Sequence, residues 1–97
     1  MLKVELIKEN YKKLIPYKIE LLNKYKEVIH ILDLHIEKDY TETQIKRAIT
    51  RDYSYIDESI RHYTYYLYVS RRDTPIFYKD LKKNKWIRIK GVHILAL

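Results

Sequence analysis

The spacing of the apolar residues constrains the fold of this chain more than any other feature of its sequence. Between residues 17 and 36 they recur mostly at intervals of three and four, which places them along one stripe of a helix. The residues of this stripe are Leu21, Leu22, Tyr25, Val28, Ile29, Leu32 and Ile36. We therefore predict a helix over residues 17–36. Residues 29–36 also alternate in part with a period of two, so a strand at the end of the segment stays an alternative.

A second apolar stripe lies nearer the N-terminus and ends at a proline. Its members are Val4, Ile7, Tyr11 and Leu14, and lysines occupy the other face. Pro16 disfavours helical geometry at the residue before it and clashes with the preceding turn. We expect an amphipathic helix that breaks or kinks at this proline.

Capping residues mark a pair of short helices in the middle of the chain. Thr41 can accept a hydrogen bond from the first-turn amides, and Gln44, three residues later, completes a capping box. This chemistry predicts a helix over residues 42–50. Residues 51–54 are expected to form a turn, because N-cap residue types occur there, and a further helix is predicted over residues 55–66.

The C-terminal part of the sequence predicts a β-hairpin. Residues 70–75 form the clearest loop of the chain. Beyond it, residues 76–79 and 86–90 are rich in β-branched and aromatic residues and alternate, with a lysine-rich connection between them. Residues 92–97 form an apolar tail, which we expect to pack in the core or against a second subunit.

Large apolar residues also relate the two central helices to each other. Intervals of four, seven, four and three separate the residues Ile45, Ile49, Ile56, Ile60 and Tyr63. With the hairpin that follows, residues 17–90 resemble a winged helix-turn-helix domain, of the kind found in small regulators of archaeal viruses. The resemblance implies that residues 55–66 are the recognition helix, with a wing tip made of Lys82, Lys83 and Lys85. The chain departs from the family in having Lys46, Thr50 and Arg51 where alanine, glycine and an apolar residue are usual.

The predicted fold is mainly α with a C-terminal β-hairpin, winged helix-turn-helix-like. The alternative is a helical bundle plus hairpin, because well-spaced isoleucines on two consecutive helices also suit a bundle. A chain of 97 residues is expected to form a single domain, 1–97. Its expected parts are N-terminal helices at 1–38, a helix-turn-helix at 41–69, a β-hairpin wing at 75–91 and the apolar tail at 92–97.

Basic residues collect in the last third of the chain. Of the net charge of +7, residues 71–97 contribute eight Lys or Arg against two Asp, which is +6. A local excess of this size attracts polyanions at long range, so double-stranded DNA is the first partner to consider. The residues expected to neutralise phosphates are Arg71, Arg72, Lys79, Lys82, Lys83, Lys85, Arg88 and Lys90. The residues expected to read bases in the major groove are Tyr53, Ser54, Tyr55, Ser59, Arg61 and His62. Lysines that protect an exposed edge strand are the alternative explanation for the basic hairpin.

Tyrosines crowd one short segment and favour a second interpretation. On a strand, Tyr66 and Tyr68 would lie on one face with Thr64. Aromatic rings beside basic side chains can stack the bases of a single strand, although packing in a core or an interface is the ordinary role of tyrosine. Tyr78 and Lys82 also have the Tyr-x-x-x-Lys spacing of rolling-circle replication nucleases, but the paired-histidine metal motif of those enzymes is missing.

Catalytic and metal-binding chemistry finds little support in the sequence. The chain has no cysteine, no Ser-His-Asp grouping and no glycine-rich phosphate loop, so we predict no enzyme, no cofactor and no metal. His30 and Asp33 could share a helix face, which is ordinarily just a surface in water.

No apolar run is long enough to span a membrane. We expect a cytoplasmic protein, inside the host cell if the chain is viral.

Together these observations predict a small homodimeric regulator of transcription that binds double-stranded DNA. The N-terminal helices and the apolar tail would form the dimer, which would match two half-sites. The alternative is an interaction module of viral or plasmid origin that binds a host protein through Tyr and Arg anchors, without nucleic acid. A peripheral membrane protein is a third interpretation, and it lacks the expected Trp- and Phe-rich amphipathic helix.

Overall fold

An antiparallel sheet dominates the part of the chain that the structure describes, residues 14–90. This structure is a computed structural model. Strands make up 47% of the described residues and helices 25%. The expected mainly α fold, whether winged helix-turn-helix-like or a helical bundle plus hairpin, is therefore wrong. The predicted N-terminal helix before Pro16 and the apolar tail at 92–97 lie almost entirely outside the described residues.

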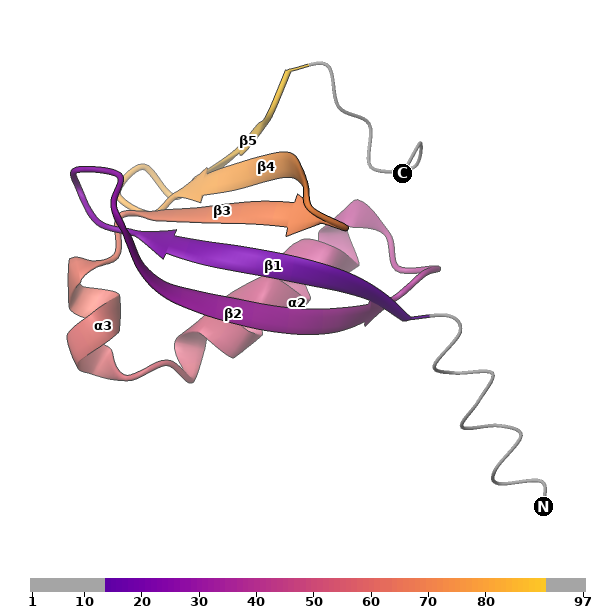
Figure 1. Cartoon of the computed structure of the whole chain (residues 1–97), viewed down its shortest axis with the longest axis horizontal. Helices are drawn as coiled ribbons and strands as arrows, with labels where there is room; N and C mark the ends of the chain where they lie inside the picture. Colours follow the sequence, from indigo (N-terminus) through magenta and orange to yellow (C-terminus); the bar gives the residue numbers. More distant parts are fainter. Residues whose placement is uncertain (1–13, 91–97) are drawn as a thin grey trace.

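Five strands and two helices follow one another within residues 14–90. Their order along the chain is β1 (Leu14–Leu22), β2 (Val28–Glu37), α2 (Glu42–Ser54), α3 (Glu58–Tyr63), β3 (Tyr66–Arg71), β4 (Thr74–Asp80) and β5 (Lys85–Arg88). In the sheet the order is β2-β1-β3-β4-β5, and every neighbouring pair is antiparallel. Helix α2 crosses one face of the sheet and α3 lies at one end of it (Figure 1). No helix in this range has the length and apolar character needed to cross a membrane.

The segment predicted as a long helix, residues 17–36, is instead most of a β-hairpin. In β1, Tyr17, Ile19 and Leu21 point to the core and are at most 3% exposed, whereas the residues between them lie on the other face. The apolar residues of a strand that is buried on one face alternate with a period of two. The helical stripe was misleading because it joined residues of two strands and a turn. The alternative strand at 29–36 corresponds to part of β2.

A side-chain-braced turn closes this hairpin. The Asn23 side-chain oxygen accepts hydrogen bonds from the N–H groups of Tyr25 and Glu27, each at 3.0 Å. The side-chain amide of Asn23 also donates to the Glu27 carboxylate at 3.0 Å. Lys26 takes the left-handed conformation with φ of 64°. These bonds satisfy backbone groups that the turn would otherwise leave open, so they hold the hairpin tip in one shape.

Helix α2 begins as the sequence predicts. The Gln44 N–H donates to the Thr41 hydroxyl oxygen at 3.2 Å, and the Thr41 N–H donates to the Gln44 side-chain oxygen at 2.8 Å, which completes the capping box. The helix continues through residues 51–54, so the turn predicted there is wrong. Tyr53 favours this continuation because its ring packs against the core.

Helix α3 is much shorter than the helix predicted over residues 55–66. It begins at an N-cap, Asp57, and has six residues. The Thr64 hydroxyl donates to the Ile60 carbonyl oxygen at 2.8 Å, and the Tyr65 N–H donates to the Leu22 carbonyl oxygen at 2.7 Å. The bond to Leu22 directs the chain into the sheet, so the last predicted helical residue, Tyr66, begins β3.

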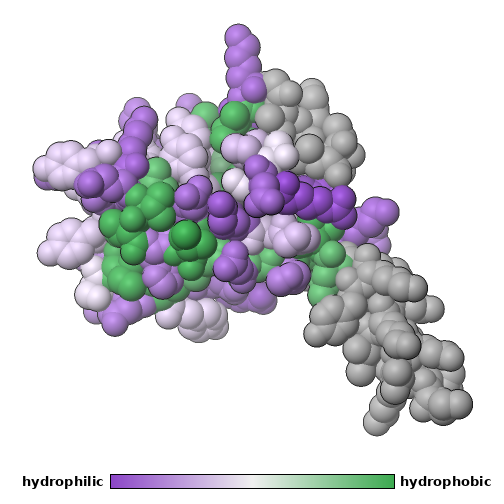
Figure 2. All heavy atoms as spheres, viewed as in Figure 1, coloured by the Kyte–Doolittle hydropathy of each residue, from purple (hydrophilic) through white to green (hydrophobic). Residues whose placement is uncertain are grey.

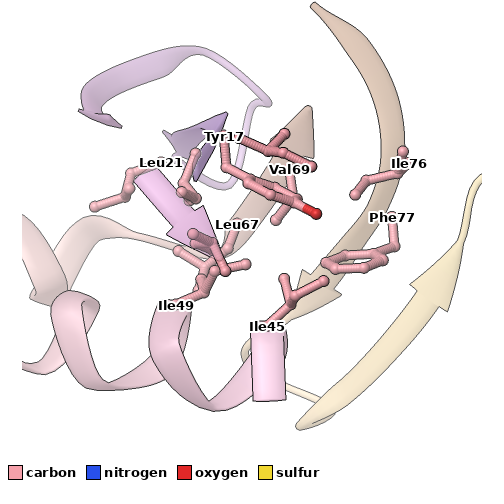
Figure 3. Packing of buried hydrophobic residues seen from close by; sticks show 11 residues of the cluster. Tyr17, Leu21, Ile45, Ile49, Leu67, Val69, Ile76 and Phe77 are labelled. Atoms are coloured by element: carbon pink, nitrogen blue, oxygen red, sulfur yellow. The ribbon is translucent and has the colours of Figure 1, made fainter. Parts of the chain in front are cut away.

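The core lies between α2 and the sheet. Cross-strand register aligns Leu32, Ile19, Val69, Phe77 and Arg88 in one row across all five strands. From α2, Ile45 and Ile49 pack onto the apolar members of this inner face (Figure 3). Each fully buried side chain of this kind contributes about 1.5–3 kcal/mol of transfer free energy.

The predicted C-terminal hairpin is present as β4 and β5, with the lysine-rich turn between them. The loop predicted at residues 70–75 is reduced to a tight turn, because most of it belongs to β3 and β4. Arg72 and Asp73 form this turn with φ of 49° and 66°. A turn with two positive φ values has the twist that suits a tight hairpin.

Candidate functional site

The sheet face opposite α2 carries a cluster of three tyrosines. Strand register aligns Ile31, Glu20, Tyr68, Tyr78 and Ile87 in a row across this outer face. The rings of Tyr68 and Tyr78 stack with their centroids 4.7 Å apart and an interplanar angle of 6°. A third ring, from Tyr66, approaches both at 6.4 Å with steep angles, edge to face. We call these three residues, Tyr66, Tyr68 and Tyr78, the tyrosine cluster.

Three connections meet at one end of the sheet, beside this cluster. They are the β1–β2 turn, the segment between α3 and β3, and the β4–β5 turn (Figure 1). The Tyr65 N–H donates to Leu22 at the end of β1, and the Leu81 N–H donates to the Tyr65 carbonyl oxygen at 2.9 Å. Tyr65 therefore ties the two turns to each other through its own backbone.

Lysines from both turns lie over tyrosine rings at this end. The Lys82 ammonium is 4.5 Å from the Tyr65 ring centroid, and the Lys26 ammonium is 5.7 Å from the Tyr66 centroid. On the hairpin tip, the Lys24 ammonium is 5.1 Å from the Tyr25 centroid. Such cation–π contacts hold a charged group beside an aromatic face. We call the following residues the lysine–tyrosine end: Lys24, Tyr25, Lys26, Tyr65, Lys82, Lys83 and Lys85.

Acidic residues lie at this end of the sheet and on the rest of the outer face. Asp80 accepts hydrogen bonds from the N–H groups of Lys82 and Lys83, each at 3.1 Å, so its carboxylate braces the basic turn. Farther along the sheet, Glu20 lies opposite Tyr68, and Asp33 lies opposite Lys18. Acidic side chains therefore lie both in the lysine-rich β4–β5 turn and beside the tyrosine cluster.

The basic residues predicted to contact phosphates do not form one patch. Lys82, Lys83 and Lys85 lie together in or beside the β4–β5 turn, whereas Arg72 lies in the β3–β4 turn at the other end of the sheet. Lys90 is exposed after the last strand. The surface excess suggested by the sequence is thus split between two ends of the sheet.

Three of the predicted phosphate contacts belong to the helix-covered face. Arg88 pairs with Glu42 of α2 at 2.6 Å, and the Lys79 ammonium is 5.5 Å from the Trp86 ring centroid. Arg71 is only 8% exposed and its guanidinium is 5.9 Å from the Tyr17 ring centroid. Burial raises the pKa of Tyr17, although the nearby positive charges oppose the shift. These basic residues brace the fold.

The predicted base-reading residues have mainly local partners. The Tyr53 hydroxyl donates to the Arg61 carbonyl oxygen at 3.4 Å, and burial raises the pKa of Tyr53. The Arg61 Nε donates to the Ile56 carbonyl oxygen at 2.8 Å. Ser59 bonds to the Asp57 carboxylate, which lowers the pKa of that carboxyl group. Ser54 donates to the Arg51 carbonyl oxygen, and Tyr55 and His62 are exposed.

A hollow of about 510 Å³ opens between the β1–β2 turn and α3. Its apolar and aromatic lining comes from Tyr25, Ile29, Ile60, Tyr63 and Tyr65, and Lys24 and His62 also line it. Figure 2 shows hydrophobic atoms gathered over the first part of β2, with paler side chains at the hairpin tip and over α3. The hollow shares Tyr25, Tyr65 and Lys24 with the lysine–tyrosine end.

Sequence reasoning found only part of this arrangement. The idea that Tyr66 and Tyr68 share the face of a strand is confirmed, but Thr64 is buried at the end of α3 and is not on that face. Lys24 and Lys26 were missed because their segment was assigned to a helix. The signal that could have found them is the alternation in β1 followed by Asn23, a turn-forming residue.

Within residues 14–90, no cluster of three or more histidine or acidic side chains is arranged to hold a metal ion. Comparison with known proteins gives no match for this chain among family models, curated proteins or solved structures.

Proposed function

We propose that this protein binds single-stranded nucleic acid across the tyrosine cluster and the lysine–tyrosine end. Bases would stack on the exposed parts of the tyrosine rings, and phosphates would lie beside the lysines of the two turns. Aromatic rings on an open antiparallel sheet, with basic side chains at its margin, are a common means of holding unpaired bases.

One observation carries the proposal. Lysines from two different turns, Lys26 and Lys82, lie over successive tyrosines, Tyr66 and Tyr65. The Tyr66 ring also packs edge to face against the stacked Tyr68–Tyr78 pair on the outer face. Two cation–tyrosine contacts and the ring that borders the stacked pair therefore lie at one end of the sheet, which supports a site for both the phosphates and the bases of a strand.

A single strand suits this surface better than the duplex expected from the sequence. The duplex proposal required a recognition helix over residues 55–66, and α3 has only six residues. Stacking on the sheet requires bases that are already unpaired, which a single strand provides without the cost of opening a duplex. Because every base has a flat face, we expect little sequence preference.

A salt titration tests the proposal. Fluorescence anisotropy with a labelled single-stranded oligonucleotide should show binding that weakens between about 50 and 200 mM salt, with a logarithmic slope of about −0.7 for each phosphate contacted. In the Lys26→Ala, Lys82→Ala double variant, the slope should become shallower by about 1.4. A duplex of the same sequence should bind more weakly.

A matched control removes the same charge elsewhere. The double variant Arg47→Ala, Arg51→Ala acts on exposed residues of α2, away from the outer face. Its slope should equal that of the unmodified protein. Equal losses in the two double variants would show that only net charge matters, and absence of binding at low salt would remove the proposal.

A specific observation also supports the alternative function, protein interaction. Strand β2 is an edge strand with no partner on its outer side among the described residues, and Val28 and Ile31 on it are each 48% exposed. An edge of this kind can accept a strand from a host protein or from a second copy of this chain. Analytical ultracentrifugation tests the homodimer. The unmodified protein should sediment as a dimer, and the Ile31→Lys variant should sediment as a monomer.

A further inference from the structure

We propose that the hollow between the β1–β2 turn and α3 binds one unstacked nucleotide, with its base against the tyrosine rings and its phosphate beside Lys24 and Lys82. This inference rests on the proposed function and assigns the hollow to one nucleotide of the bound strand. Its volume of about 510 Å³ lies within the range of about 300–1,000 Å³ that holds small organic ligands.

The lining of the hollow favours a flat aromatic ligand. Tyr25 and Tyr63 are 72% and 65% exposed, so large parts of both rings are open to a ligand. Ile29 and Ile60 add aliphatic surface. Exposed aromatic side chains of this size gathered around one hollow are typical of a binding site, because water solvates such a surface poorly.

The charges at the hollow favour an anionic ligand. Lys24 lines it directly, and Lys82 lies over the ring of Tyr65, which also lines it. His62 contributes a side chain that can donate to a phosphate. A neutral apolar ligand would use the rings and leave these donors without a partner, whereas a nucleotide would use both.

Both walls of the hollow are braced before any ligand arrives. On one side, the Asn23 side chain fixes the hairpin tip through three hydrogen bonds. On the other, the Asp57 carboxylate accepts from the Ser59 N–H at 3.0 Å at the start of α3. A preformed wall reduces the entropy lost on binding.

Titration of the isotope-labelled full chain with adenosine 5′-monophosphate, followed by NMR, tests the inference. The amide signals of residues 24–25 and 59–65 should shift more than those of the tyrosine cluster. The Tyr25→Ala, Tyr63→Ala double variant should weaken the binding at least about fivefold, and Tyr63→Phe should retain it. Inorganic phosphate alone should bind more weakly than the nucleotide.

Tyr55→Ala is the matched control, because Tyr55 is 81% exposed and lines neither the hollow nor the tyrosine cluster. It should leave nucleotide binding unchanged. Shifts confined to the tyrosine cluster, or no shifts while an oligonucleotide still binds, would overturn this inference and leave the proposed function intact. If neither the nucleotide nor the oligonucleotide binds, both proposals fall.

Discussion

Two neighbouring rows of residues run across the same five strands and lie on opposite faces of the sheet. The inner row of Leu32, Ile19, Val69, Phe77 and Arg88 faces α2, and its apolar members belong to the core or pack against it. The outer row, displaced by one residue in each strand, holds the Tyr68–Tyr78 stack. Because side chains alternate along a strand, a shift of one residue separates the core residues from the proposed binding surface.

The largest difference between the rows should appear in stability. Phe77→Ala removes a fully buried ring and should lower the free energy of unfolding by about 3–5 kcal/mol. The neighbouring residue on the outer face is Tyr78. Tyr78→Ala removes mainly a ring–ring contact and should lower the free energy of unfolding by about 1 kcal/mol. Urea denaturation measures both. Equal destabilisation would show that the two faces are not energetically distinct.

Oligonucleotide binding, in contrast, should depend on the outer row. Tyr68→Ala should weaken the binding of a single-stranded oligonucleotide by about 1–3 kcal/mol, because a stacking surface for one base is lost. Anisotropy titrations, with Tyr55→Ala as the control, measure the change. An affinity equal to that of the unmodified protein would place the interface elsewhere.

A substitution at the start of α2 should change stability and leave binding unchanged. Thr41→Ala removes one half of the capping box and should lower the free energy of unfolding by about 1 kcal/mol. Oligonucleotide affinity should stay the same, because α2 lies behind the sheet (Figure 1). A parallel loss of affinity would mean that the helix takes part in binding.

The smallest expected effect is a dependence on pH at α3. Hydrogen bonds from the Ser59 N–H and hydroxyl lower the pKa of Asp57 in the folded state. A carboxyl group with a lowered folded pKa adds stability above its unfolded pKa, and this stability is lost as the pH falls through the folded value. Asp57→Asn should therefore flatten the acid limb of the stability curve. Thermal melts at a series of pH values measure this curve. An acid limb equal to that of the unmodified protein would contradict the prediction.

Local chemistry was easier to predict from the sequence than the topology. The cap at Thr41 and the strands around Lys82 and Lys83 depend on neighbouring residues, and both are present. The β1–β2 hairpin was missed because a helical stripe and an alternating pattern overlap between residues 17 and 36. Pairing of β1 with β3, which is distant in sequence, also favours the strand, and the local pattern does not reveal it.

The candidate site was harder to predict for the same reason. Lys26 and Lys82 are far apart in the chain and reach neighbouring rings only because β1 and β4 flank β3 in the sheet. Basic residues do gather after residue 70 in the sequence. Arg71 and Arg88, however, do not lie on one surface with the lysines of the β4–β5 turn. Their partners, Tyr17 and Glu42, lie in other elements.

The measurement that tests the central claim most directly is cross-linking of a bound single strand. A single-stranded oligonucleotide containing 4-thiouridine is irradiated in the complex, and the attached peptides are identified by mass spectrometry. The account predicts attachment at Tyr66, Tyr68 and Tyr78 and at the two lysine-bearing turns. Attachment to the exposed face of α2, or no attachment above the level seen with Tyr68→Ala, would contradict it.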